Sequence, residues 1–319
     1  MYEWNEAIQK MIDWIEAHLT ENPTLPEMSK QIGYSPYYCS TRFHEICGMT
    51  IKSYISGRRL ALAALAVRDT SDRILDIAMK YGFSSQESLT RAFRTTLGCT
   101  PAMYRENPVP VPLPIKRVIY FPDHYQTLHQ GGAAMSQTTL TDARVRVEYI
   151  PAHRYIGIWD DQASGYGDFF AKHDCDAICG IIDSMQNVSH PIVTPHTAGW
   201  YLVNGKRGYF YGFGVFADYD GIVPEGFAIR EFPASYYLVF CHPPFDYLKD
   251  NDKVMEKVET LAWNYDLENE GNSGNPLSHQ GRRSRFAWNE DVCQCYQRHY
   301  PEGIGYEILR PVKIRNHNL

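Results

Sequence analysis

Four polar residues at helical spacing are the strongest candidates for chemistry in this sequence. They are Gln86, Glu87, Thr90 and Arg91. They lie largely off the apolar stripe that Leu89, Phe93 and Leu97 form by recurring every four residues. In the major groove of DNA, Gln can form two hydrogen bonds with adenine, and Arg can form two with guanine. This pattern predicts a helix whose outer face reads base edges in double-stranded DNA.

Three further basic residues flank this predicted helix or lie on it. They are Lys80, Arg94 and Arg105. Contacts with phosphate oxygens position a protein on DNA without reading its sequence, and Lys and Arg supply many of them. We therefore expect these three side chains to contact the phosphate backbone.

The predicted reading helix needs a second helix to hold it, and the preceding residues supply one. Asp72 can cap a first helix, and Gly82 can end it, because glycine adopts the left-handed backbone conformation without a Cβ penalty. Ser84 or the next serine opens the second helix, and Glu87 can complete a capping box with Ser84. A short helix, a glycine turn and a second helix are the plan of a helix-turn-helix.

The same plan occurs about 50 residues earlier, so the sequence contains an internal repeat. The matched pairs are Gly33 with Gly82, Phe43 with Phe93, and Gly48 with Gly98. In the first copy, the outward N-terminal half of the second helix carries Tyr37, Ser40 and Thr41. We expect these residues to offer aromatic, hydroxyl and methyl contacts. A helix at about 51–68 joins the two copies. A plain helical bundle with solvated polar faces is the competing interpretation.

The charge distribution supports a DNA-binding first third. The whole chain has a formal net charge of −6, but residues 36–105 carry 10 Lys/Arg against 5 Asp/Glu. A basic segment joined to an acidic remainder suggests two partners of opposite charge. No apolar run reaches the length of a membrane span, and no signal peptide is evident, so we expect a cytoplasmic protein with reduced cysteines.

From Arg144 onward the pattern changes to short β-strands. Residues 107–143 are Pro-rich at their start and read as a linker. Beyond them the strands follow two rounds of strand-strand-helix-strand-strand, with helices expected at 168–185 and 245–265. The segments VEYIPAHRYI and IREFPASYYL repeat the pair Pro-Ala and a tyrosine in register.

Residues 5–105 resemble the DNA-binding domain of the AraC/XylS family of transcription regulators. The segments GYSPYYCSTRFHEICG and DIAMKYGFSSQESLTRAFRTTLGCTPAMYR carry the resemblance. It implies an all-α domain over 1–106, in which the two helix-turn-helix units contact DNA through the residues named above. It also implies RNA polymerase as a partner. Family members often have a longer polar or basic side chain where this chain has Thr41.

Residues 144–319 resemble the GyrI-like effector-binding domain of multidrug-sensing regulators. The resemblance rests on architecture and on a final strand with a glutamate before proline, YEILRPV. It implies an α+β fold of two strand-helix-strand-strand repeats. The order of the two domains resembles the Rob subgroup of the AraC/XylS family.

The C-terminal part is acidic and rich in aromatic residues, a composition that suits a small aromatic or cationic effector. The candidate binding residues are Glu307, Trp159, Trp200, Tyr211 and Tyr296, with Glu231 as a second carboxylate. Glu307 matches the ligand glutamate of the resembled family. Alternatively, the aromatic rings are ordinary core and Glu307 pairs with an arginine.

Two other functions remain open for the C-terminal part. A small hydrolase would use Glu307 as a base together with Tyr211 or Tyr296, and a protein-interaction module would need no pocket. We expect a regulator rather than an enzyme. We also expect no cofactor and no metal site, because neither His173, Cys175 and Cys179 nor Cys293 and Cys295 have the second ligand pair of a zinc site.

Overall fold

The chain forms two compact units, each described here by itself. The computed structural model describes residues 2–117, 119, 143–267, 286–300 and 304–315. The first unit comprises Met1–Gly132 and Asp174–Asn187, and the second comprises Ala133–His173 and Val188–Leu319. The first unit thus includes Asp174–Asn187, a segment that the sequence pattern assigns to the C-terminal domain.

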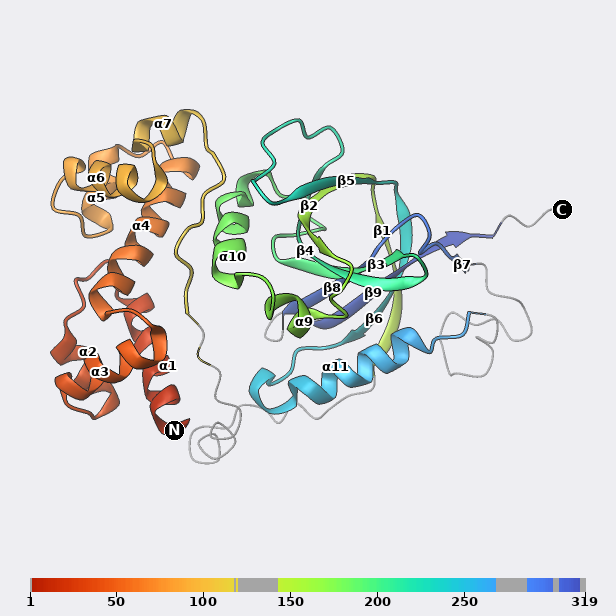
Figure 1. The fold of residues 1–319 in the computed structure, drawn as a ribbon, viewed down its shortest axis with the longest axis horizontal. Helices are drawn as coiled ribbons and strands as arrows, with labels where there is room; N and C mark the ends of the chain where they lie inside the picture. The colour runs from red at the N-terminus through yellow and green to blue at the C-terminus, as the bar shows by residue number, and fades with distance from the viewer. Residues whose placement is uncertain (1, 118, 120–142, 268–285, 301–303, 316–319) are drawn as a thin grey trace. The chain divides into compact units, whose positions relative to one another are not determined.

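Seven helices of the first unit come from the N-terminal third of the chain (Figure 1). They are α1 (Tyr2–Ala17), α2 (Leu25–Ile32), α3 (Pro36–Cys47), α4 (Ile51–Asp69), α5 (Ile74–Lys80), α6 (Gln86–Leu97) and α7 (Pro101–Glu106). Helices α2 and α3 form the first helix-turn-helix, and α5 and α6 form the second. The turn glycines of both, Gly33 and Gly82, have φ angles of 76° and 74°. The predicted repeat is confirmed.

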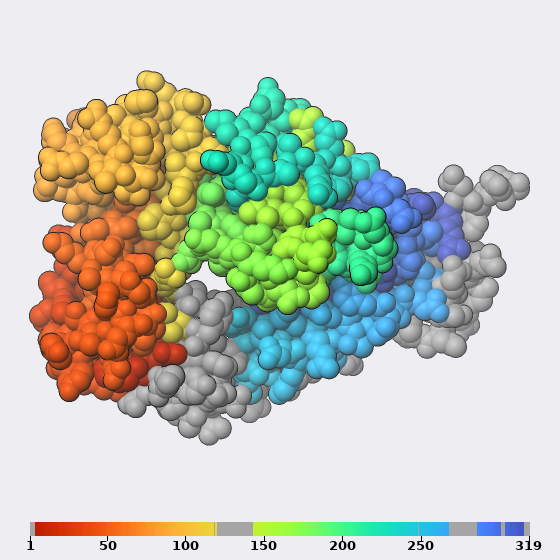
Figure 2. Space-filling view, viewed as in Figure 1, coloured from red at the N-terminus to blue at the C-terminus, as the bar shows by residue number. Residues whose placement is uncertain are grey.

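Each helix-turn-helix has its own apolar core, and α4 contributes to both. The N-terminal part of α4 packs Tyr54 against Phe43 of the first helix-turn-helix. Its C-terminal part packs Leu60 and Val67 in the cluster that contains Phe93 of the second. Figure 2 shows the two halves as separate lobes, one red to orange and the other orange to yellow. The relative orientation of the halves therefore depends on α4 and on the contacts around it.

Both helix-turn-helix units have side-chain caps, but those of the second differ from the caps that the sequence predicts. Thr24 and Glu27 form a capping box at the start of α2, and Ser35 caps α3. In the second, the capping box joins Ser85 and Ser88, so the predicted pairing of Ser84 with Glu87 is wrong. The predicted cap at Asp72 is also wrong, because Arg73 is the N-cap of α5 and makes no side-chain cap.

We expect Ser85→Ala to lower the stability of the first unit by about 1 kcal/mol. Ser85 Oγ accepts a hydrogen bond from the Ser88 N–H at 3.2 Å, and Ser88 Oγ accepts one from the Ser85 N–H at 3.1 Å. Alanine removes the first of these bonds. Urea unfolding followed by circular dichroism measures the change. Ser84→Ala is the matched control and should fall within about 0.5 kcal/mol of the wild type. An equal loss in both variants would contradict the assignment of the cap.

The second unit is built on one antiparallel sheet. Its strands are β1 (Arg144–Ile150), β2 (His153–Asp160), β3 (Thr197–Val203), β4 (Lys206–Phe216), β5 (Ala228–Phe232), β6 (Ser235–His242), β7 (Phe286–Trp288), β8 (Cys295–Tyr300) and β9 (Gly305–Ile314). The order is β1-β6-β9-β8-β3-β4-β2-β5, and β7 pairs with β9.

This strand order is symmetric about the central β8-β3 pair. If β1, β2, β3 and β4 are matched with β5, β6, β8 and β9, the order reads the same from both ends. Each repeat also contributes one edge strand to the other, because β1 pairs with β6 and β5 pairs with β2. The two similar segments VEYIPAHRYI and IREFPASYYL occupy matched positions in these two repeats. Tyr155 and Tyr237 are both fully buried, and their rings lie 6.2 and 5.8 Å from the ring of Tyr296.

Between the strands, the structure has two helices where the sequence predicted one at 168–185. They are α9 (Tyr166–Phe170) and α10 (Cys175–Ser184). The break follows from Asp174, which is the N-cap of α10 and accepts a hydrogen bond from the Ala177 N–H at 3.1 Å. The second repeat has α11 (Tyr247–Trp263), which lies along β6 and β9 (Figure 1). Among the described helices, none has the length and apolar character of a membrane span.

The two faces of the sheet bury different sets of side chains. One face, called here the inner face, is an apolar cluster that includes Tyr155, Phe210, Tyr237, Tyr296 and Leu309. The other face packs on helices. For example, the ring of Tyr211 lies 4.9 Å from that of Phe170 in α9, and the ring of Trp200 lies 5.2 Å from that of Trp263 in α11. Alternation along the strands produces this division.

Candidate nucleic-acid interface and effector face

The outer surface of α6 carries the predicted base-reading residues. Gln86, Glu87 and Arg91 are exposed and Thr90 is half-buried, whereas Leu89 and Phe93 are fully buried. Arg94 is also exposed. Within the part of the chain that the structure describes, neither Arg91 nor Arg94 has a recorded hydrogen bond or ion pair. Both guanidinium groups therefore keep their full donor capacity for a ligand.

Glu87 gives this surface a localised negative charge. A hydrogen bond with the Ser85 side chain lowers the pKa of the Glu87 carboxyl. The group therefore stays ionised at neutral pH and acts only as an acceptor. In the major groove, the cytosine amino group is the donor that a carboxylate accepts from.

The first recognition helix, α3, presents a different surface. The Tyr37 side chain is 75% exposed and Ser40 is exposed, while Thr41 is half-buried. Thr41 Oγ1 donates to the Tyr37 carbonyl oxygen at 3.0 Å. This bond occupies the hydroxyl proton, so Thr41 keeps its methyl group and the acceptor capacity of Oγ1 for direct contact. This side of the surface therefore presents aromatic, hydroxyl and methyl groups.

Several basic residues counted in the charge excess are engaged inside the protein. Arg105 donates from Nε to the Val67 carbonyl oxygen at 2.9 Å and from Nη2 to that of Asp72 at 2.7 Å. Its expected role as a phosphate contact is therefore a poor fit, since these bonds hold the end of α4. Lys80 instead lies over the ring of Tyr81, with Nζ 5.3 Å from its centroid.

Arg59 links the two helix-turn-helix halves. Its Nε donates to the Leu19 carbonyl oxygen at 2.7 Å, and its Nη2 donates to Asn22 Oδ1 at 2.9 Å, both beyond the end of α1. The same guanidinium lies beside Gly82, where an added Cβ would be 2.6 Å from Arg59 Cζ. Arg59 thus contacts the first half and packs against the turn of the second.

The predicted effector residues do not form one group. Tyr296 belongs to the inner face and Trp159 packs against it, whereas Trp200 and Tyr211 lie on the helix-covered face. Tyr211 therefore does not lie beside Glu307, and the structure does not assemble the hydrolase pair of Glu307 with Tyr211. The Tyr296 hydroxyl lies 2.5 Å from His153 Nε2 and also accepts from the side-chain amide of Gln294.

Glu307 is paired with arginines on the inner-face side of β9. Its carboxylate is almost fully buried and lies 2.8 Å from Arg146 Nη1 and 3.3 Å from Arg298 Nη1. Glu148 completes a four-residue network, at 2.7 Å from Arg298 Nη2 and 3.1 Å from Arg146 Nη2. Two positive and two negative charges balance in this network. Glu307 therefore pairs with arginines, as in the alternative interpretation of the sequence.

Sequence reasoning missed Arg230, which supplies the cation at the other end of the inner face. Its Cζ lies 4.3 Å from the ring centroid of Trp159 and 5.2 Å from that of Tyr201. The repeat of the Pro-Ala segment aligns Arg230 with Glu148, so the two repeats carry residues of opposite charge at this matched position. The next residue, Glu231, is exposed and pairs with Arg154 at 2.6 Å, so it does not face this cluster.

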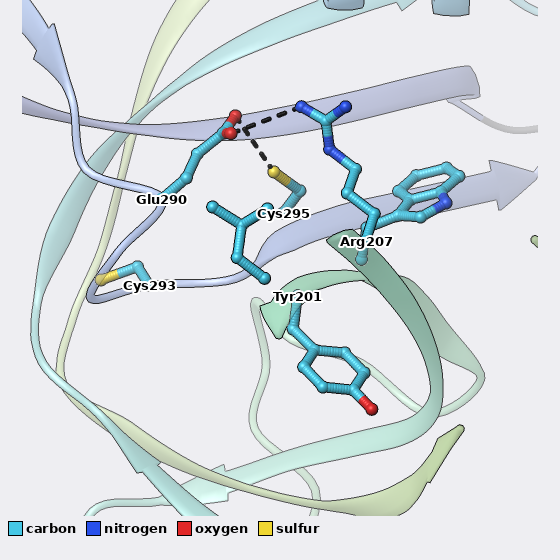
Figure 3. A pocket seen from close by; sticks show the side chains of 7 residues that line it. Tyr201, Arg207, Glu290, Cys293 and Cys295 are labelled. Carbon is cyan, nitrogen blue, oxygen red and sulfur yellow. Dashed lines mark hydrogen bonds and ion pairs between the residues drawn. The ribbon is translucent and has the colours of Figure 1, made fainter. Parts of the chain in front are cut away.

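A shallow hollow lies beside the sheet, and Figure 3 shows its lining. The lining residues are Trp200, Tyr201, Leu202, Arg207, Glu290, Cys293 and Cys295. Glu290 bonds Arg207 at 3.4 Å and Cys295 at 3.5 Å within it. The hollow encloses no space that a water molecule could occupy, whereas ligand pockets usually enclose about 300–1,000 Å³. The hollow contains Trp200 but not Glu307 or Tyr296.

Comparison with known proteins places the similarity in the helical part. Residues 28–107 match a family described as a helix-turn-helix domain. The chain is 40% identical over 101 residues to the Right origin-binding protein of Escherichia coli (strain K12), which is 32% of this chain and 35% of that protein. It is also 40% identical over 101 residues to the Transposon Tn10 TetD protein of Escherichia coli, with 32% of this chain and 73% of that protein covered.

A third relative is covered almost completely. The regulatory protein SoxS of Salmonella typhimurium is 38% identical over 100 residues, which is 31% of this chain and 94% of SoxS. By contrast, the chain matches only about a third of the length of the Right origin-binding protein.

Proposed function

Because this chain belongs to the family of AraC-type helix-turn-helix transcription regulators, we propose that it binds specific sites in double-stranded DNA through α3 and α6 and regulates transcription in the cytoplasm. One observation carries the DNA-binding part: the exposed Gln86 and Arg91 lie on the outer face of a recognition helix whose inner face is buried. Gln and Arg are the side chains best suited to adenine and guanine.

Footprinting with genomic fragments tests this proposal. The expected result is protection of defined sites at salt concentrations at which binding to unrelated DNA is already lost. Binding that is sequence-blind and vanishes with salt would contradict it, because nonspecific affinity comes almost entirely from phosphate contacts.

We also propose that the second unit is a GyrI-like domain whose inner face binds a small aromatic or cationic effector. Support comes from Glu307, from the aromatic cluster, and from Arg230 stacked on Trp159. An effector with a positive charge would compete with Arg146 and Arg298 for the Glu307 carboxylate. RNA polymerase is the further partner that the family resemblance suggests.

Glu307→Gln is expected to weaken binding of a cationic aromatic dye about tenfold or more, because the amide keeps the shape but removes the charge. Fluorescence titration of the dye measures this effect. Glu231→Gln is the matched control, since Glu231 is exposed and pairs with Arg154. Equal affinity of wild type and Glu307→Gln would remove Glu307 from the proposed site. A protein partner for this unit is the second candidate, favoured by the closed packing of the inner face.

Helix α10 supplies a route by which effector binding would change DNA binding. It belongs to the first compact unit, although the chain on either side of it belongs to the second. Within the first unit, Ser184 Oγ accepts from the Val111 N–H at 3.0 Å, and Arg68 Nη1 donates to the Ser184 carbonyl oxygen at 2.5 Å. Gly180 allows α10 to approach the backbone of Leu113 closely, because an added Cβ would be 2.2 Å from the Leu113 carbonyl oxygen.

Gly180→Val is therefore expected to displace α10 and to abolish the change in DNA affinity caused by an effector, which must favour one of two states. Gel shifts with and without effector measure this. Ala177→Val, at a half-buried position on the same helix, is the control. An effector response that survives in Gly180→Val would show that α10 is not the route.

A further inference from the structure

Two cysteines one helical turn apart form a pair of neighbouring thiols on α10. Cys175 and Cys179 have their sulfur atoms 3.8 Å apart, and both residues are half-buried. By contrast, Cys39, Cys47, Cys293 and Cys295 are buried in the cores. The two thiols therefore lie close together and are partly accessible to solvent. Neither of them is needed for the packing of a core or for the proposed DNA-binding surface.

The spacing suits one atom that bonds both sulfurs. Two sulfur bonds of about 2.3 Å to one atom hold the sulfurs about 3.3 Å apart at a bond angle of about 90°, and about 3.8 Å apart at about 110°. The angle at pyramidal trivalent arsenic lies in the lower part of this range, so a small rotation of the two side chains brings the sulfurs to the required spacing. A direct disulfide fits less well. Residues four apart on a helix have Cβ atoms about 5–6 Å apart, whereas a disulfide needs about 3.5–4.5 Å. A bridging atom keeps the first turn of α10 intact, while a disulfide distorts it.

The surroundings favour a metalloid over a metal ion. Within the described residues, no group of three or more His, Cys, Asp or Glu side chains could hold a metal. Zinc sites use three or four protein ligands, so two thiolates leave such an ion incomplete. A trivalent organoarsenical needs only two, because its carbon substituent fills the third position of arsenic. We propose that Cys175 and Cys179 form a dithiol site for trivalent arsenicals.

The reaction is a condensation without oxidation or reduction. Two thiols react with one arsenoxide group, R–As=O. Two arsenic–sulfur bonds form, and the oxygen leaves as water with the two thiol protons. Arsenic stays trivalent, and no further reactant is needed.

Phenylarsine oxide with the full chain tests the proposal. Intact mass spectrometry should show one adduct per chain, equal to the reagent minus one water. The adduct should survive excess monothiol and be removed by a dithiol, because chelation by two sulfurs raises the effective concentration of the second. Peptide mapping should place it on the segment that contains α10. Absence of such an adduct from the wild type would overturn the proposal.

Serine variants identify the two sulfurs. Cys175→Ser and Cys179→Ser should each lower the apparent affinity about 100-fold or more, since each leaves a single thiol. Cys99→Ser and Cys241→Ser are matched controls at the other half-buried cysteines and should behave as wild type. Circular dichroism verifies that each variant is folded. A monothiol-resistant adduct in Cys175→Ser or Cys179→Ser, or its loss in a control, would also overturn the proposal.

Discussion

Arg91→Ala is expected to weaken binding to a specific DNA site by about 10- to 100-fold and to relax the preference at one base pair. Arg91 is exposed on α6, one turn beyond Glu87, and has no recorded partner in the described chain. A bidentate Arg–guanine contact contributes about 1–3 kcal/mol of discrimination against the wrong base. Competition gel shifts with every base at each position of the site measure both effects.

The neighbouring arginine on the same helix distinguishes base reading from charge. Arg94→Ala should weaken binding about equally for all sequences and reduce the slope of log affinity against log salt by about one. Arg73→Ala, at an exposed residue outside the recognition helix, controls for general loss of positive charge. If Arg91→Ala behaves like Arg94→Ala, Arg91 is a phosphate contact.

Local signals explain why the helical third could be predicted. The turn glycines Gly33 and Gly82 and the four-residue apolar spacing act within one or two turns of a helix, so neighbouring residues contain the information. Errors appeared where two local solutions compete. Ser84 and Ser85 can both cap α6, and the structure uses Ser85, which also hydrogen-bonds the exposed Glu87 carboxylate.

The network around Glu307 depends on long-range strand pairing that a single sequence does not display. Glu307 meets Arg146, which is 161 residues away, only because β1 of the first repeat pairs with β6 of the second, and β6 pairs with β9. The predicted aromatic residues lie on both faces of the sheet because of the alternation of side chains along a strand. Tyr211 lies one residue from Phe210, and neighbouring strand residues point to opposite sides. The number of aromatic residues in the sequence therefore does not show how many of their rings share one face of the sheet.

The arginine network at Glu307 should dominate the stability of the second unit. Arg298→Met is expected to lower its free energy of unfolding by about 3–5 kcal/mol. The methionine removes the cation that holds both Glu148 and Glu307, and leaves Glu307 buried with Arg146 as its remaining partner in the network. Burial alone would lower the pKa of Arg298, but the hydrogen bond and charge of Glu148 raise it.

Denaturant unfolding followed by tryptophan fluorescence measures this loss, since Trp159, Trp200 and Trp263 lie in the second unit. Arg154→Met is the matched control. It breaks the ion pair of the half-buried Arg154 with the exposed Glu231 and the Arg154 hydrogen bond to the Tyr219 carbonyl oxygen, and should cost about 1–2 kcal/mol. The pH dependence adds a second check. Burial raises the pKa of Glu148, but the bond and charge of Arg298 outweigh this and lower it.

Because the folded-state pKa of Glu148 is lowered, its ionised form stabilises the protein above the unfolded-state pKa, and this stability disappears as the pH falls through the folded-state pKa. The wild type should therefore lose stability in acid more steeply than Arg298→Met, which lacks the cation responsible for the shift. Parallel acid profiles, or equal losses in Arg298→Met and Arg154→Met at neutral pH, would mean that the network is not a major source of stability. Since effector binding at Glu307 would compete with the same two arginines, a cationic effector should also shift this acid transition in the wild type.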